Sequence, residues 1–567
     1  MAQNNETVDV LIVGSGAAGG IFAWHLSKLP NTKIVCLEQG DWLQPVPGLT
    51  EEERQAMSGH PEAAAQRERA AMPPPEAGIK RWRDGYPYDY TESFWEPVLG
   101  NGVGGASVHY GGVWGRLSPS DFRVRSLEGV ADDWPINYWD LEPYYNMVDN
   151  IVGVSGVPGN PAYPAMDRNL MPSYPLGQGS NIMVRGFDKL GWHWWPTDNA
   201  RITEPFNGRQ PCGSDCETCD TGCPVEAKNS SDVVFWPEAI RNGVELRTRA
   251  RVREITVNSD GLADGAIYYD AVGNLVEQKA RFVVLACNGI GTPRLLLNST
   301  SAQFPQGLAN GSGLVGKNLM AHPMYSVSGV FENEDAAPRR YRSNGLVSSE
   351  FVEGDPSRRG FARGFWWLGG GFTSPARAAL GELPTPRATV VPAALQFERP
   401  KGLPWGTVHR AAFQERYRHT VGGSILFEEL PLEENRVELH PTLTDDNGIP
   451  APKLVYKKSD NLKKMEPFAA ARMDDMLTAA GASRVQSGQM PTGGAYHLMG
   501  TARMGDNPDT SVVDKWGRAH DVQNLFIIDG SVMVTGGSVV VTSTIQTLAL
   551  RTADYIKENA RNLLDAS

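Results

Sequence analysis

The chain has 567 residues and carries 53 Lys and Arg against 65 Asp and Glu, a formal net charge of −12 at pH 7. The length exceeds one ordinary hydrophobic core, so we expect at least two domains, and the acidic balance leaves no basic face for a nucleic-acid partner. No apolar run of about 18 residues is present to span a membrane, and the polar start Met1–Thr7 is not a signal peptide, which predicts a cytoplasmic chain.

The beginning of the chain has the pattern of a strand, a glycine-rich turn, a helix and a second strand. Val8–Val13 is a β-branched run typical of a buried strand, Ala17–Leu29 carries apolar residues at helical spacing, and Lys33–Glu38 is a second strand that ends in an acid. Elements in this order form the first unit of a Rossmann-type domain. We therefore expect an α/β fold with a site for FAD or NAD at this turn.

The turn itself contains Gly14, Gly16 and Gly19 at the spacing of a dinucleotide-binding motif. The first glycine permits a tight turn, the second lets the backbone reach a pyrophosphate, and the third lets helix and strand touch. The helix N-terminus offers free N–H groups to the phosphates. Glu38 is placed to accept a hydrogen bond from a ribose 2′-hydroxyl.

The next region combines an excursion from the domain with a second glycine-rich loop. Asp41–Pro97 is charged and Ala-rich and then Pro-rich, which suggests a helical excursion followed by a surface loop. Asn101–Arg116 is too rich in glycine for a regular element, and such backbone usually lies against a ligand or another backbone. His109 stands in the middle of it, either as a packed histidine with local hydrogen bonds or as a functional group.

Four cysteines lie within twelve residues. Cys212, Cys216, Cys219 and Cys223 give the spacing C-x3-C-x2-C-x3-C, followed directly by proline. Crowded thiolates need a metal to neutralise them, and soft sulfur ligands select zinc or an iron–sulfur cluster. A single tight loop ending in Cys-Pro favours ferredoxin-type ligation over zinc, with one or two local disulfides as the remaining alternative.

Several other segments have patterns that predict secondary structure or packing. Asp132–Gly156 has the spacing of an amphipathic helix after a Trp-Pro turn. Trp192–Trp195 is an aromatic cluster that could stack on a sugar face or belong to the core. Ser326–Thr420, rich in Gly, Pro and Arg, is expected to be an insertion of the substrate domain, and Asn447-Gly448 marks a hairpin turn.

Four motifs together resemble the glucose–methanol–choline (GMC) oxidoreductases: VGGAS at Val103–Ser107, GLVGKNLMAHP at Gly313–Pro323, HLMGTARMG at His497–Gly505 and NLFIIDGS at Asn524–Ser531. The resemblance covers the whole chain. It implies a Rossmann-type FAD-binding domain and an α+β substrate domain built on an antiparallel sheet. The expected FAD-binding domain comprises residues 1–45, 95–125, 230–322 and 485–567, the substrate domain 126–205 and 323–484, and a cysteine-rich insertion 206–229.

The resemblance also assigns ligands for the flavin nucleotide. The N-terminal glycines and Glu38 would hold the ADP half of FAD, and the loop with Gly104, Gly105 and Ser107 would approach the flavin. His109 matches a histidine that in pyranose 2-oxidases and some sugar dehydrogenases is covalently joined to the flavin ring. Further along the chain, the family's adenine, pyrophosphate and ribityl contacts fall on Val252, Asp529 and Gly530.

In this family the histidine of the HLMGTARMG motif, here His497, takes the hydroxyl proton while the carbon's hydrogen leaves as a hydride to flavin N5. An alcohol donates hydride poorly until a neutral imidazole begins to remove its proton. Relatives place a His or Asn where this chain has Val540, and a proline where it has Val541. Three interpretations follow: His497 works alone with help from Ser538 or Thr542, the substrate needs a different partner, or the chain is a weakened or non-redox member.

The branch of the family most similar in these motifs oxidises sugars and glycosides, and includes fructose, glucose and glucoside 3-dehydrogenases. The resemblance therefore implies oxidation of a secondary hydroxyl at C-3 or C-2. Electrons would pass through a 3Fe-4S or 4Fe-4S cluster to a small subunit and a cytochrome c-type acceptor, and a signal-bearing partner could carry the chain to the periplasm. The alternatives are a polyol or sterol oxidase or dehydrogenase, or a weakened member that serves as an electron-transfer or scaffold subunit.

Overall fold

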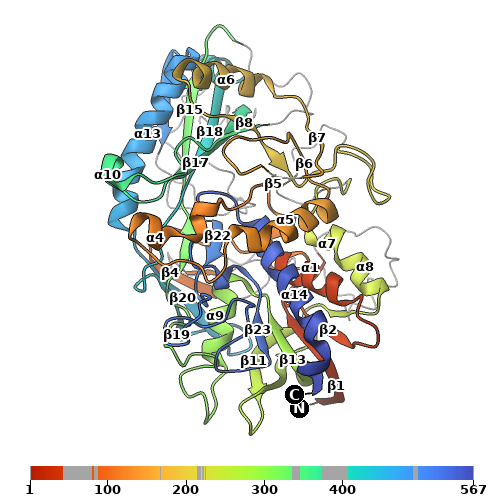
Figure 1. Ribbon diagram of the computed structural model, residues 1–567. Helices are drawn as coiled ribbons and strands as arrows, with labels where there is room; N and C mark the ends of the chain where they lie inside the picture. Colours follow the sequence, from red (N-terminus) through yellow and green to blue (C-terminus); the bar gives the residue numbers. More distant parts are fainter. Residues whose placement is uncertain are drawn as a thin grey trace.

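The computed structural model describes residues 2–42, 79–81, 87–165, 168–212, 219, 223, 225–334, 345–372, 406–488 and 496–565. Two large sheets organise the molecule (Figure 1). One carries β1, β2 and β13 in the lower part of the view, and the other carries β15, β17 and β18 in the upper part. The predicted combination of a Rossmann-type domain with an α+β domain on an antiparallel sheet is confirmed.

The nucleotide-binding sheet has seven strands in the order β10-β2-β1-β13-β12-β11, with β23 also paired to β13. The pairs β10/β2, β2/β1, β1/β13 and β13/β23 are parallel, and β11 and β12 form an antiparallel addition. β23 continues along the same edge of β13 where β12 ends. The strands are β1 (Ala2–Val13), β2 (Ile34–Leu37), β10 (Glu245–Arg247), β11 (Arg251–Val257), β12 (Ala263–Tyr269), β13 (Leu275–Leu285) and β23 (Leu525–Ile527).

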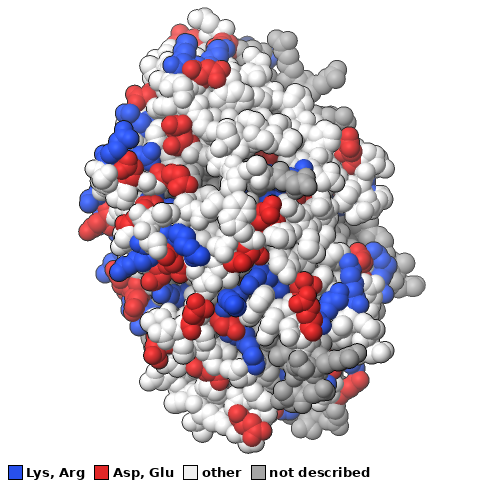
Figure 2. All heavy atoms as spheres, in the orientation of Figure 1, with Lys and Arg blue, Asp and Glu red and all other residues white. Residues whose placement is uncertain are grey.

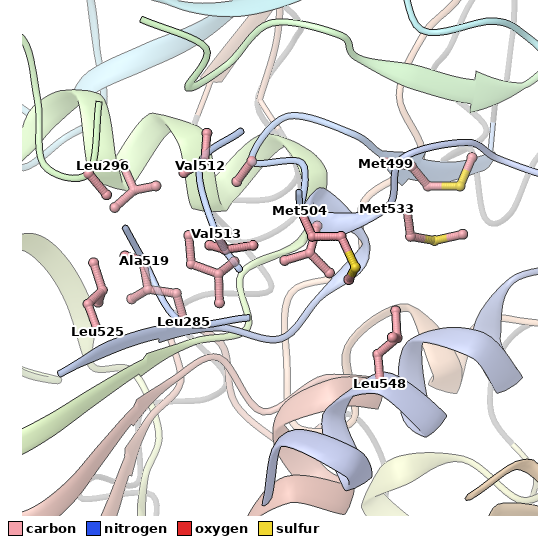
Figure 3. Packing of buried hydrophobic residues seen from close by; sticks show 14 of the residues in the cluster. Leu285, Leu296, Met499, Met504, Val512, Val513, Ala519, Leu525, Met533 and Leu548 are labelled. Carbon is pink, nitrogen blue, oxygen red and sulfur yellow. The ribbon is translucent and has the colours of Figure 1, made fainter. Parts of the chain in front are cut away.

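Both faces of this sheet are covered, as the continuous apolar run of β1 requires. Val10 and Ile12 face a core formed with helices α1 (Ala17–Leu26) and α14 (Thr542–Asp565), which lie side by side (Figure 1). Leu11 and Val13 face a second core on the opposite side. Figure 3 shows part of this second core, where Leu285 and Leu525 from neighbouring strands lie beside Ala519, and Met499 lies close to Met533.

The substrate-domain sheet is antiparallel throughout, with the order β21-β15-β18-β17-β16-β8. Helices α6 (Gln178–Leu190) and α13 (Asp460–Ala480) pack on one face. The other face presents Trp366, Val347 and Leu426 to the same core as the nucleotide-binding sheet. The strands are β8 (Trp195–Pro196), β15 (Met324–Val330), β16 (Leu346–Ser348), β17 (Phe365–Phe372), β18 (Thr420–Phe427) and β21 (Arg484–Gly488).

Three smaller sheets connect these parts. The predicted hairpin turn at Asn447-Gly448 is confirmed, since it joins β19 to β20 and Gly448 has φ +75°. β20 also pairs in parallel with β4, a strand that the sequence analysis had assigned to a surface loop; the expected helical excursion lies outside the described residues. The sheets consist of β3 (Ile79–Arg81), β4 (Pro87–Ser93), β19 (Arg436–Thr444) and β20 (Pro450–Tyr456); β5 (Val113–Trp114), β6 (Ser155–Gly156), β7 (Met171–Pro172) and β9 (Asp198–Asn199); and β14 (Met320–His322) with β22 (Tyr496–Met499).

The amphipathic helix predicted after the Trp-Pro turn is α5 (Tyr138–Val152), which begins with a capping box between Asn137 and Asp140. Its buried side packs against α14. The remaining helices are short: α4 (Val124–Glu128), α7 (Ser231–Val234), α8 (Trp236–Arg241), α9 (Asn288–Asn298), α10 (Pro356–Arg359), α12 (Thr407–Arg416), and the 3-10 turns η1 (Gly105–Val108), η2 (Pro119–Phe122) and η4 (Gly530–Val532).

The charged surface shows no patch of a single sign on the face seen in Figure 2, where acidic and basic side chains are interspersed. Among the helices of the described residues, none is long and apolar enough to cross a bilayer.

Candidate active site

The nucleotide turn between β1 and α1 is built by close backbone contacts. A Cβ at Gly14, which has φ +99°, would lie 2.5 Å from the carbonyl oxygen of Ala286, and a Cβ at Gly19 would overlap the carbonyl oxygen of Gly14. At Gly16 the nearest atom to an added Cβ is the Cα of Gly105, 3.9 Å away. A side chain at Gly14 or Gly19 would therefore clash with backbone, whereas there is free space beside Gly16.

Glu38 braces this turn from the end of β2. Its carboxylate accepts hydrogen bonds from the backbone N of Ser15 (2.9 Å), from Ser15 Oγ (2.6 Å) and from the backbone N of Gly40 (2.9 Å). Burial raises the pKa of Glu38, and these hydrogen bonds oppose the rise. The sequence analysis predicted that Glu38 binds a ribose hydroxyl; in the structure its carboxylate binds the backbone and side chain of the turn.

The loop with Gly104 and Gly105 packs against that turn. Its glycines therefore contact another stretch of backbone, one of the two possibilities that the sequence left open. The N–H of Gly104 donates to Ser15 O at 3.2 Å, and a Cβ at Gly105 would lie 2.9 Å from Gly16 Cα. Ser107 Oγ donates to Gly104 O at 2.6 Å and accepts from the backbone N of Ser231 at 2.9 Å. The two glycine-rich segments thus form one cradle.

His109 follows η1 directly, and its neighbours are fixed by a buried lysine. Lys228 Nζ donates to the carbonyl oxygens of Val108 (2.6 Å), Tyr110 (3.1 Å) and Cys219 (2.5 Å). One buried ammonium therefore ties the loop around His109 to the cysteine-rich segment. No feature of the sequence analysis pointed to Lys228.

Asp529 occupies the far end of the cradle, where β23 leads into η4. It accepts hydrogen bonds from the backbone N of Asn288 (3.1 Å), Thr292 Oγ1 (2.5 Å) and the backbone N of Ser531 (2.9 Å). Burial raises the pKa of Asp529. Gly530 packs against Leu498 O, and Val252 lies buried in β11, on the far side of β12 from β13.

A flavin nucleotide fits this cradle. The N-terminus of α1 has no side-chain cap, so its N–H groups are available to phosphate oxygens. The space beside Gly16 is the space a pyrophosphate needs to reach the backbone.

His497 lies on β22 and its ring contacts a second histidine. Its Nδ1 is 2.9 Å from Nδ1 of His322, which lies on the paired strand β14, and the two rings are nearly perpendicular with centroids 5.0 Å apart. His497 has φ +66°, an uncommon conformation for a non-glycine residue that is often found at functional sites. Burial lowers the pKa of His497 to about 4, so the ring is neutral at pH 7.

His322 was missed by the sequence analysis as a site residue. It is completely buried, and burial together with the neighbouring His497 lowers its pKa well below the ordinary value. The signal that could have found it is its place in the GLVGKNLMAHP segment, which contributed to the family resemblance.

Val540 and Val541, at the positions of the relatives' His or Asn and proline, offer no hydrogen bond from their side chains. Val541 is fully buried, and Val540 packs on the core beside Gly115, where an added Cβ would be 3.5 Å from Val540 Cγ2. Ser538, considered above as a helper, is fully buried and donates to Glu428 Oε2 at 3.2 Å. Its hydroxyl is thus directed to Glu428.

A cavity of about 290 Å³ lies next to this segment, with Gly115 in its wall. Three tryptophans, Trp114, Trp195 and Trp366, line it. Of the Trp192–Trp195 cluster, Trp195 lines the cavity, whereas Trp192 and Trp194 pack on the core of the substrate domain.

Two arginines and two carboxylates form a network at the cavity. Arg168 contacts Asp149 (2.8 Å) and Asp198 (2.5 Å), and Arg116 contacts Asp149 (2.6 Å). Arg116, Arg168 and Asp198 line the cavity. The network carries two positive and two negative charges and is therefore balanced.

The cysteine-rich segment does not form a metal centre within the described residues. Cys219 and Cys223 are free thiols, and no group of three His, Cys, Asp or Glu that could hold a metal is found among the residues described. Burial raises the pKa of Cys219, which favours the thiol. Cys216 lies outside the described residues. The predicted iron–sulfur cluster is therefore not supported by the structure.

A nucleotide cradle together with a neutral imidazole is the arrangement of a flavin-dependent oxidoreductase. Family models described as GMC oxidoreductase match residues 8–324 and 431–549. The chain belongs to the GMC oxidoreductase family and is an FAD-dependent enzyme that acts on alcohol- or sugar-type substrates.

Two of the relatives cover the chain almost completely. The chain is 36% identical to 2-methyl-1,2-propanediol dehydrogenase of Mycolicibacterium austroafricanum over 100% of its own length and 98% of the relative's. It is 28% identical to the fructose dehydrogenase large subunit of Gluconobacter japonicus, over 98% and 99% of the two chains. Among solved structures, formate oxidase of Aspergillus oryzae has the same fold, with a TM-score of 0.60 at 15% identity over 99% of this chain and 100% of that chain.

Proposed function

We propose that this protein is a dehydrogenase that oxidises a secondary hydroxyl of a neutral sugar or glycoside, at C-3 or C-2, with His497 as the base. The observation that carries the proposal is the partly accessible, neutral imidazole of His497, whose Nδ1 edge is buried on His322. The accessible edge of the ring then carries Nε2, which can accept the hydroxyl proton. FAD, when bound, supplies the acceptor for the hydride.

The cavity supports a neutral, hydroxyl-rich substrate. Its tryptophans offer flat apolar faces of the kind that stack on sugar rings, and the arginine–carboxylate network offers hydrogen-bond partners without a net charge to select a sugar acid or an amine. Relatives are named for a neutral sugar (fructose), a sugar acid (gluconate) and an amine (paromamine). The balanced charge of the network favours the neutral sugar over the other two.

A small diol is the second candidate substrate, because the relative with 36% identity is named for 2-methyl-1,2-propanediol. Anaerobic bleaching of the flavin distinguishes the two candidates. Aldoses and glycosides should reduce the flavin faster than 1,2-diols of four carbons or fewer under the sugar proposal, and the reverse order supports the diol. No bleaching by either class would refute both and indicate a weakened member.

The valine at position 540 leaves His497 without the second polar residue of its relatives. Under the proposal His497 works without it, at a rate below that of a paired site by about 10²–10⁴-fold, the usual contribution of an acid–base group. Val540→Asn should therefore raise the rate of flavin reduction. An unchanged rate would show that this position does not contact the reacting hydroxyl.

We propose that electrons leave the flavin through an iron–sulfur cluster to a small subunit and a cytochrome c-type acceptor. The cysteine spacing is the support for the cluster. The names of two relatives, the fructose dehydrogenase large subunit and the gluconate 2-dehydrogenase flavoprotein of Pantoea cypripedii, support a partner subunit. The described cysteines do not converge on a metal. Iron and acid-labile sulfide in the purified protein would support the cluster, and their absence after anaerobic purification would remove it. Export to the periplasm with a partner depends on the same subunit and is tested by co-purification.

A further inference from the structure

His322 lies directly behind the proposed base. The two histidines stand on adjacent strands of an antiparallel pair, in which Met320 is paired with Met499 and His322 with Tyr496. The Nδ1–Nδ1 distance of 2.9 Å is that of a hydrogen bond, and His322 has no exposure to solvent. The contact is therefore fixed by backbone pairing and shielded from water.

Two neutral imidazoles that meet through Nδ1 must share one proton, so one ring donates and the other accepts. If His322 donates, His497 carries its own proton on Nε2 and cannot take one from a hydroxyl. If His322 accepts, the proton of His497 is on Nδ1, and Nε2 is free to act as a base. The direction of this one hydrogen bond decides whether His497 can react.

The backbone around Gly536 indicates which of the two histidines donates the hydrogen bond. Nε2 of His322 is buried and makes no hydrogen bond of ordinary geometry among the described residues, but a Cβ at Gly536 would lie 3.0 Å from it. The backbone of Gly537 and Gly536 opposes the lowering of the His322 pKa, as a carbonyl oxygen near a ring N–H does, and the close approach of Gly536 to Nε2 assigns that N–H to Nε2. A proton on Nε2 of His322 leaves its Nδ1 as the acceptor.

We propose that His322 is a positioning residue, whose Nδ1 accepts a hydrogen bond from Nδ1–H of His497 and so holds the base in the tautomer with Nε2 unprotonated. The inference rests on the proposed function of His497. In the proposed reaction the hydroxyl O–H bond breaks and its proton goes to Nε2 of His497; FAD, when bound, would accept the hydride from the carbon. The positive charge that develops on His497 is shared with His322 through the same hydrogen bond.

The test compares two substitutions of His322 in the FAD-loaded protein. His322→Asn keeps an acceptor oxygen near the position of Nδ1, whereas His322→Leu fills similar space without one. We expect H322L to lower the rate constant of flavin reduction roughly 10- to 100-fold with KM nearly unchanged, and H322N to recover most of the rate. His25→Leu, which removes a buried histidine between α1 and α14, is the matched control and should leave the rate within about twofold.

Two further measurements separate this inference from the proposed function. His497→Ala should cost about 10²–10⁴-fold, and the double variant H322L/H497A should be no slower than H497A, because His322 acts through His497. In the protein labelled with ¹⁵N in its histidine rings, the His497 signals, assigned by their loss in H497A, should report a proton on Nδ1 in wild type and a mixture of tautomers in H322L.

The outcomes are distinguishable. If H497A keeps turnover, the proposed function fails. If H497A is inactive while H322L reacts at the wild-type rate, or if H322N loses as much as H322L with folding intact, the positioning role of His322 is refuted. A proton on Nε2 of His497 in wild type would also refute it.

Discussion

Gly289, at the start of α9, sets how closely that helix approaches the strand that carries His497. A Cβ at Gly289 would lie 2.6 Å from both the carbonyl carbon and the carbonyl oxygen of Leu498 and 2.9 Å from the backbone N of Met499. These atoms belong to backbone and cannot rotate away. Gly289→Ala should therefore push β22 and α9 apart.

The size of the effect follows from these distances. An ordinary Cβ contact begins near 3.4 Å, so the strand next to His497 must move by roughly 0.8 Å. Overpacking of this kind costs typically about 1–3 kcal/mol, and the better helix propensity of alanine returns at most about 1 kcal/mol. A displacement near 1 Å at a catalytic group can cost about 10²-fold in rate.

The assay measures urea unfolding, the affinity for FAD and the rate of flavin reduction. We expect Gly289→Ala to lose about 1–2 kcal/mol of unfolding free energy and at least tenfold in rate. The affinity for FAD should also fall, because Asn288 and Leu498 contact Asp529 and Gly530 at the far end of the cradle. Gly291→Ala on the same helix is the control, since its nearest neighbour is the Cβ of Cys287 at 3.1 Å and a small shift suffices. Wild-type rate and stability in G289A would refute the reasoning.

Three further predictions concern the cradle, the base and a buried acid. Gly16→Ala should change the unfolding free energy of the FAD-free protein by no more than about 1 kcal/mol, since there is room for a methyl group. It should raise the Kd for FAD at least tenfold in a fluorescence titration. An unchanged Kd would mean that the pyrophosphate does not approach this residue. Because the pKa of His497 is lowered to about 4, kcat/KM should rise with pH through about 4 and show no step from this group near 6.5; a wild-type profile that rises at 6.5 contradicts the structure. Burial raises the pKa of Glu429 to about 7 from its ordinary 4.5. The protonated carboxyl therefore contributes its full share of unfolding free energy below pH about 4.5, and this share is lost as the pH rises through about 7. In urea unfolding at a series of pH values, Glu429→Gln should lose less unfolding free energy over this range than wild type; the same pH dependence in both proteins would contradict the prediction.

Local patterns predicted the local structure. The β-branched run, the glycine spacing and the helical periodicity of the first forty residues gave the first Rossmann unit, and Asn447-Gly448 gave the hairpin, because each depends on neighbours in sequence. The family motifs gave the two-domain architecture, which periodicity alone does not contain.

The contacts that complete the site join distant parts of the chain and have no local signal. His322 and His497 are separated by 175 residues, and Lys228 meets Val108 across 120. Such contacts depend on how sheets and loops pack, which hydrophobic periodicity does not specify. The hydrogen bond from Ser538 to Glu428 is of the same kind, since Glu428 lies 110 residues earlier.

β23 pairs with β13, and α14 packs against α1, although β23 and α14 are synthesised much later than their partners. These contacts can therefore form only near the end of synthesis. A ribosome that adds about 5–20 residues per second needs roughly 25 to 100 s to travel from α1 to α14. During that interval the part of α1 that packs on α14 stays uncovered, although α8 already contacts the same helix, so the nascent polypeptide is exposed to aggregation and to chaperones. Coenzyme capture therefore belongs to the end of translation rather than to its beginning.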